Sequence, residues 1–307
     1  MSLNPSVLPE DLEPAFRGFL TGHGGRPLAY SRWDHPAPRG RVVLSHGYGE
    51  HGERYRHTAC WLHRLGWAVT ALDHQGFGRS GGIRGDAAGI QAPVADLVQL
   101  LHHERLEDAR AWGERRPQLL LGHSYGGLLA LLALLWHPEA LDGLVLSAPA
   151  VALRPIPAPL RLLQRLLLLA APHRPVAVKG DKTQVCSDPV LVQRYWDDPL
   201  CHHLVTAGFL AALQEGQAEL LGMGAELDRP ILLLEAGRDT VADPDGAEAL
   251  WRAVRPDLLE RHRLDAFMHE IFHDVRRPEA ESLVEGWLER KFPALSGTAA
   301  PSAATLN

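Results

Sequence analysis

The stretch from Gln118 to Trp136, QLLLGHSYGGLLALLALLW, constrains the fold more than any other part of the 307-residue chain. It opens with a short apolar run typical of a buried strand, turns at a serine between glycines, and closes with an apolar run of helical length. Gly122 and Gly126 lie two positions on either side of Ser124, where small residues let a strand and a helix pass closely. The stretch therefore predicts a strand, a sharp turn at Ser124 and a buried helix.

Short apolar runs alternate with helical patterns along much of the rest of the chain. A glycine-rich turn inside residues 17–33 predicts an antiparallel hairpin at the start. Further strands are expected at residues 41–45, 67–72, 143–147, 231–235 and about 260–264. Strands of about five apolar residues separated by helices indicate an α/β fold, with a mostly parallel sheet covered by helices on both faces.

This alternation stops between residues 151 and 226, where prolines punctuate the sequence and an apolar helix is expected at 160–171. A segment of this length with its own helices and no strands is typical of an insertion over the sheet. We therefore predict a core formed by residues 1–150 and 227–295 and a helical cap formed by residues 151–226. The tail, residues 296–307, is small and polar and is predicted to be disordered.

Composition and charge exclude some classes of function. A formal net charge of -6 argues against binding nucleic acid, which needs a basic face. The three cysteines have unrelated spacings, so a disulfide framework is not expected and a cytoplasmic location is predicted. The first residues do not resemble a signal peptide. No apolar run approaches the roughly 20 residues of a membrane-spanning helix.

A serine at such a turn becomes a nucleophile only when a base takes its proton and a carboxylate orients that base. In folds with this motif the order along the chain is serine, acid, histidine. Asp239 follows the strand at 231–235, whereas Asp243 is expected to cap a helix beginning at Pro244. His269 lies in the loop after the last strand, and His273 is the second choice of base. The predicted catalytic residues are therefore Ser124, Asp239 and His269.

An oxyanion formed at Ser124 needs two backbone N–H donors. One is the N–H of Tyr125, which follows the serine. The other is expected from the glycine-rich loop after the strand at 41–45, where Tyr48 is the best candidate.

Two further motifs suggest other chemistry. Residues 269–273 read H-E-x-x-H, the signature of zinc peptidases, but no clear third ligand follows and such an enzyme would not need Ser124. Residues 76–81 read G-x-G-x-x-G, but more glycines follow and no helix opens at once, as dinucleotide binding requires. We interpret them as a tight loop, and predict neither a metal nor a cofactor.

Three longer motifs carry a family resemblance. Residues 46–55 read H-G-x-x-E-H-x-x-R-Y, residues 73–82 read D-x-x-G-x-G-x-S-x-G, and residues 122–127 read G-H-S-x-G-G. On these motifs the chain resembles the α/β-hydrolase superfamily over nearly its whole length. More narrowly, it is similar to the monoacylglycerol lipase and lysophospholipase branch.

The resemblance implies the same triad and adds a role for Glu50 and Arg54 as a polar pair near the alcohol side of the substrate pocket. Equally, these two could form a structural ion pair that braces the oxyanion loop. The implied function is a serine hydrolase that cleaves monoacylglycerols through an acyl-enzyme on Ser124. Alternatives that keep the triad are a lysophospholipase, a broad carboxylesterase, an aminopeptidase and an acyltransferase. A binding protein with a silent triad is a third possibility.

The cap is expected to carry the acyl-chain tunnel. Residues 161–169 combine leucines with arginines on the opposite side, which suits a helix that touches a membrane or micelle transiently. Packing of the same helix on the core is the alternative interpretation.

Overall fold

The structure is a computed structural model that describes residues 12–155, 157–178 and 181–294. The predicted tail at residues 296–307 lies outside the described residues.

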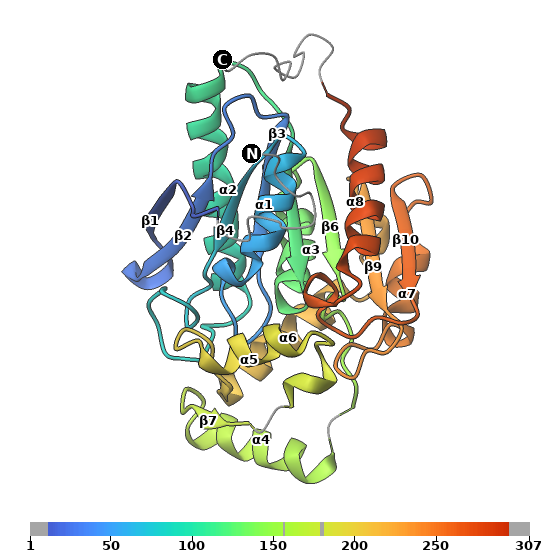
Figure 1. Cartoon of the computed structure of the whole chain (residues 1–307). Coiled ribbons are helices and arrows are strands. Elements are labelled where there is room, and N and C mark those ends of the chain that lie inside the picture. The colour runs from blue at the N-terminus through green and yellow to red at the C-terminus, as the bar shows by residue number, and fades with distance from the viewer. Residues whose placement is uncertain (1–11, 156, 179–180, 295–307) are drawn as a thin grey trace.

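Eight strands form one sheet in the order β1-β2-β4-β3-β5-β6-β9-β10 (Figure 1). The strands are β1 (Phe16–Thr21), β2 (Pro27–Trp33), β3 (Gly40–Ser45), β4 (Trp67–Leu72), β5 (Gln118–His123), β6 (Gly143–Ser147), β9 (Ile231–Ala236) and β10 (Leu259–Leu264). The first hairpin is antiparallel, as is the pairing of β2 with β4. All other pairs are parallel because helical crossovers connect the strands, so the predicted mostly parallel sheet is confirmed.

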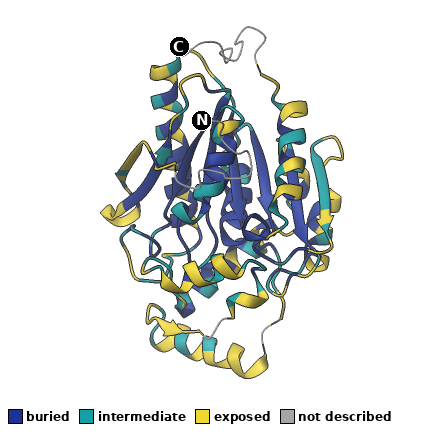
Figure 2. Cartoon of the chain, in the orientation of Figure 1, coloured by how far each residue is buried: buried dark blue, intermediate teal, exposed yellow. Residues whose placement is uncertain are grey.

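Helices cover both faces of the sheet, and each face has its own apolar core. One core includes side chains of α1 (Arg56–Arg64) and α8 (Arg277–Lys291). The other includes side chains of α2 (Gln91–Trp112), α3 (Tyr125–Trp136) and α7 (Glu248–Ala253). Figure 2 shows the sheet buried between these layers. Five strands of this sheet, β3, β4, β5, β6 and β9, are buried along their whole length, which explains their continuous apolar runs.

The cap segment, residues 151–226, lies at one end of the sheet (Figure 1). It contains α4 (Ala158–Ala170), β7 (Val176–Ala177), α5 (Pro189–Asp197), β8 (Leu204–Val205) and α6 (Ala207–Leu220). The expectation of a segment without strands was wrong, because β7 and β8 pair antiparallel. Two residues on each side are too few to give a strand pattern in the sequence.

The two halves of the cap segment differ in packing. Phe209 and Leu213 of α6 are buried in the core around α3, whereas α4 has no buried residue. His202 and His203 lie outside the helices, because α5 ends at Asp197. Asp198 starts a turn by accepting the Leu200 N–H (2.8 Å), and Pro199 disfavours helical backbone at Asp198.

Among the described residues, no helix is both long enough and apolar enough to cross a bilayer.

The packing of α3 predicts a position-dependent loss of stability. Leu131→Ala should lower the free energy of unfolding by about 2–5 kcal/mol because Leu131 is fully buried in α3. The same change at Leu106, which is 59% exposed on α2, should have an effect within about 0.5 kcal/mol. Urea denaturation of both variants measures the difference, and equal losses would contradict the packing described.

Candidate active site

Ser124 occupies a strained turn between β5 and α3. Its backbone has φ 51° and ψ -115°, a left-handed conformation that is rare for a residue with a side chain. The flanking glycines let the segments meet, since a Cβ at Gly126 would overlap the carbonyl oxygen of Ser45 at the end of β3. A Cβ at Gly122 would lie 2.5 Å from the Gly126 carbonyl oxygen. The predicted strand, turn and helix are therefore present, and they hold Ser124 beside the end of β3.

The structure brings the three predicted catalytic side chains together. The Ser124 hydroxyl lies 2.9 Å from Nε2 of His269, and Nδ1 of His269 lies 2.7 Å from a carboxylate oxygen of Asp239. All three residues are buried. This is the geometry in which an imidazole can take the serine proton while a carboxylate stabilises the resulting imidazolium.

Asp239 is held by the backbone as well as by His269. Its second oxygen accepts the N–H groups of Val241 and Ala242, both at 2.8 Å. Burial alone would raise the pKa of Asp239, but the hydrogen bond and charge of His269, with these two N–H groups, lower it below its ordinary value. The carboxylate therefore stays ionised. Asp243, the alternative acid, forms an ion pair with Arg154 at 3.6 Å.

The loop after β3 lies against the serine. A Cβ at Gly47 would lie 3.4 Å from the Ser124 Cβ, so the backbone that leads to Tyr48 passes beside the hydroxyl-bearing carbon. Tyr125 begins α3, whose first N–H groups are free of helical partners. The backbone that leads to Tyr48 and the first turn of α3, which begins at Tyr125, thus approach Ser124 from two segments. The Tyr48 hydroxyl also donates to the Leu204 carbonyl in the cap segment.

Glu50 and Arg54 lie behind this loop in a buried charged cluster. Glu50 accepts the Gly47 N–H (2.7 Å) and the Tyr55 hydroxyl (2.8 Å), and it is paired with Arg54. Arg54 also pairs with Glu270 at 3.1 Å. Neither Glu50 nor Arg54 lines the apolar cavity at Ser124. The contacts therefore give Glu50 a direct hold on the backbone of the oxyanion loop.

Glu270 connects this cluster to the cap, which the sequence reasoning missed. Its carboxylate pairs with Lys182 of the cap segment at 2.7 Å, and Lys182 lies 3.9 Å above the ring of Tyr195. Burial would raise the pKa of Glu270, but Lys182 and Arg54 hold it well below its ordinary value. Lys182 and Glu270 are 88 residues apart, so no local pattern in the sequence indicated this contact.

The H-E-x-x-H and G-x-G-x-x-G motifs have other roles in the structure. His269 is engaged by Ser124 and Asp239, and the ring of His273 contacts the Arg54 carbonyl (3.3 Å). Residues Ile271–His273 form a short 3-10 helix rather than the α-helix that places two zinc-binding histidines on one face. Gly76 donates to the Gly81 carbonyl (2.8 Å), and the next helix begins only at Gln91. The G-x-G-x-x-G stretch is therefore a tight loop.

An apolar cavity of about 630 Å³ opens at Ser124. Tyr48, Ser124 and Tyr125 line it on the core side. The cap segment contributes mostly apolar side chains, among them Leu160, Leu163 and Leu167 of α4 and Phe209, Leu210 and Leu213 of α6. Its volume is typical of a site for a small ligand, and its walls favour an aliphatic group.

Comparison with known proteins places the chain in a family. Residues 36–276 match the family model described as serine aminopeptidase, S33, a hydrolase family. The chain belongs to this family. It is 31% identical over 272 residues to a monoacylglycerol lipase of Mycolicibacterium smegmatis, covering 88% of this chain and 95% of the relative. It is 32% identical to a monoglyceride lipase of Rattus norvegicus, covering 69% of each chain.

Solved structures agree with this membership. A monoacylglycerol lipase of Paleococcus ferrophilus has a TM-score of 0.74 at 27% identity, covering 86% of this chain and 99% of its own. A monoglyceride lipase of Saccharomyces cerevisiae, solved with a substrate analogue, has a TM-score of 0.79 at 20% identity, covering 92% and 98%. The predicted α/β-hydrolase fold is therefore confirmed, as is the resemblance to the monoacylglycerol lipase branch.

Buried histidines around Ser124 predict an acid-sensitive fold. Burial lowers the pKa of His46, of His74 and of His123, the last to about 3. Because these folded pKa values lie below the unfolded value of 6.5, the unfolded chain binds more protons at acid pH. Stability is thus fully present above pH 6.5 and falls below it, by up to about 1.4 kcal/mol per pH unit for each histidine.

Urea denaturation at several pH values between about 7.5 and 5 measures how steeply the free energy of unfolding depends on pH. In a His74→Asn variant this slope should be shallower, because unfolding takes up about one proton fewer. An identical slope in the variant would contradict the assignment for His74.

Proposed function

We propose that the protein hydrolyses carboxylic esters, preferentially monoacylglycerols, through an acyl-enzyme on Ser124. The observation that carries this proposal is the hydrogen-bonded chain from Ser124 through His269 to Asp239, which ends at the mouth of a large apolar cavity. The relatives named as monoacylglycerol lipases support the choice of substrate.

In the proposed mechanism His269 removes the proton of Ser124 as the serine oxygen attacks the ester carbonyl. The N–H groups of Tyr48 and Tyr125 stabilise the oxyanion, assisted by the positive end of the α3 dipole. His269 then gives its proton to the departing glycerol oxygen, which leaves the acyl group on Ser124. A water molecule, deprotonated by His269, releases the fatty acid and restores the serine.

We propose that the acyl chain lies in the apolar cavity and that residues 151–226 act as the cap over a core of residues 1–150 and 227–295. The cavity walls come from both α4 and α6, which supports a role of the cap in selecting the chain. One aliphatic chain suits a cavity with so few polar groups, whereas the glycerol head needs polar partners outside it.

For Glu50 and Arg54 we propose that the main role is to brace the oxyanion loop. Glu50 accepts the Gly47 N–H and holds Arg54, so it sets the backbone on which the Tyr48 N–H depends. A direct contact with the glycerol head, implied by the family resemblance, stays a prediction.

We also propose that the cap touches lipid surfaces transiently through α4. Six leucines of this helix are exposed, Leu160, Leu162, Leu163, Leu166, Leu168 and Leu169. Three leucines of the same helix, Leu160, Leu163 and Leu167, line the cavity, which suits uptake of a substrate from a micelle. None of the three cysteines, which all lie within the described residues, forms a disulfide, which supports the predicted cytoplasmic location.

The first test is covalent labelling. A fluorophosphonate should modify Ser124 alone, and Ser124→Ala should lower kcat by roughly 10⁴- to 10⁶-fold while the variant stays folded. Peptide mapping by mass spectrometry locates the adduct. A folded protein labelled at another serine would refute the mechanism.

The second test compares monoacylglycerols, lysophospholipids and short p-nitrophenyl esters by kcat/KM. We expect the highest values for monoacylglycerols, because the site combines an apolar chain pocket with a small polar head region. Equal values for all three would favour a broad carboxylesterase, and a preference for lysophospholipids would favour the lysophospholipase alternative.

The role of Glu50 is tested by Glu50→Gln. If Glu50 braces the oxyanion loop, kcat should fall roughly 10- to 100-fold for glycerides and for p-nitrophenyl esters alike. Contact with glycerol would instead raise KM for glycerides alone. Glu53→Gln is the matched control, since Glu53 also pairs with arginines, Arg17 and Arg79, but does not hold the oxyanion loop.

A further inference from the structure

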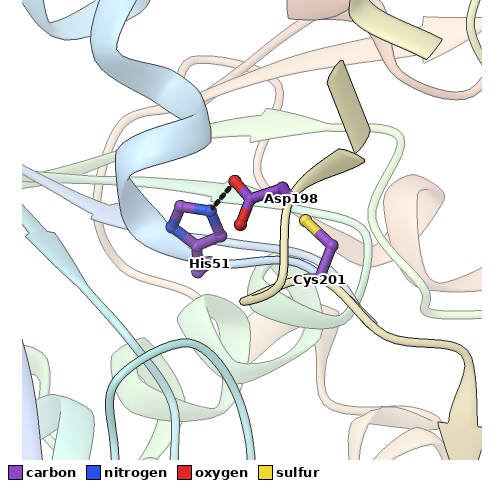
Figure 3. A group of neighbouring side chains, drawn as sticks. All are labelled: His51, Asp198 and Cys201. Carbon is purple, nitrogen blue, oxygen red and sulfur yellow. Dashed lines mark hydrogen bonds and ion pairs between the residues drawn. The ribbon is translucent and has the colours of Figure 1, made fainter. Parts of the chain in front are cut away.

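A second group of reactive side chains lies where the cap segment meets the oxyanion loop. His51 follows the loop after β3, and Asp198 and Cys201 follow α5 (Figure 3). One ligand atom from each lies within 4.8 Å of the other two. Nε2 of His51 is 2.9 Å from an oxygen of Asp198. The family function described above uses none of these three groups.

We propose that His51, Asp198 and Cys201 form a zinc-binding site that joins the oxyanion loop to the cap. An imidazole nitrogen, a thiolate and a carboxylate oxygen are the ligands that Zn²⁺ prefers, and three protein ligands leave a fourth position for water. The ligand atoms are already close enough that small side-chain rotations would bring them to bonding distance of one ion.

The surroundings also suit a closed site. His51 is 4% exposed, and its Nδ1 has no hydrogen-bond partner among the described residues. The nearby cations, Arg54 and Lys182, are balanced by the carboxylates of Glu50 and Glu270, which reduces their repulsion of a metal ion. The two segments are joined by the backbone as well, since the His202 N–H donates to the Gly49 carbonyl at 3.0 Å.

Binding would release one proton. Zinc would replace the proton of the Cys201 thiol as the Zn–S bond forms, and that proton would pass to solvent. The bound ion would tie Gly49, the neighbour of Tyr48, to the segment after α5 and so resist separation of the cap from this loop.

The test uses the full chain after chelator treatment. Titration with Zn²⁺, followed by calorimetry and native mass spectrometry, should show one bound ion and a raised Tm. Co²⁺ should give the near-ultraviolet absorption of a thiolate–cobalt bond. Cys201→Ser should lose this absorption and lower the zinc affinity about 100-fold or more, and Cys60→Ser, a change at a remote thiol, should keep both.

Three results would overturn the proposal. The first is that no stoichiometric zinc binding is found, and the second is zinc binding that is unchanged in Cys201→Ser. The third is loss of binding in His269→Ala, which would locate the ion at the H-E-x-x-H stretch instead. Because binding and absorption are measured without substrate, these outcomes are independent of whether the protein hydrolyses monoacylglycerols.

Discussion

The strained backbone of Ser124 is the constraint on which the rest of the site depends. A left-handed turn between a strand and a helix costs about 1–3 kcal/mol and persists only where packing on both sides fixes it. The burial of α3 supplies that packing. The turn also brings α3 so close to the end of β3 that only a glycine fits at position 126, where Gly126 lies. The loop after β3 therefore arrives beside the hydroxyl as a consequence of backbone geometry.

A buried network of charged side chains connects the loop after β3, the predicted base His269 and the cap segment. Glu50 holds the oxyanion loop, Arg54 joins Glu50 to Glu270, and Glu270 is the neighbour of His269. Lys182 extends the set into the cap. Burying ions is costly, and loss of one partner leaves an uncompensated charge. The placement of the oxyanion donors, the base and the cap is thus coupled through one network.

Much of the fold and of the site could be predicted because the relevant signals are local or follow chain order. The apolar runs gave the buried strands, and the positions after β9 and β10 singled out Asp239 and His269. The partners of Glu270 could not be predicted, because Lys182 is 88 residues away in the sequence. The β7–β8 pair likewise depends on a contact between distant residues, since Val176 pairs with Val205. The contact of Glu50 with the Gly47 N–H is local, but the direction of a side chain within a loop leaves no pattern in the sequence.

The helix α4 stands apart from all of these constraints. It lines the cavity yet buries none of its residues, so its side chains contribute little to the stability of the core. Substitutions on its cavity side, at Leu163 or Leu167, could therefore reshape the pocket at little cost to folding. The shape of this wall is therefore separable from the positions of Ser124, Asp239 and His269, none of which α4 holds in place.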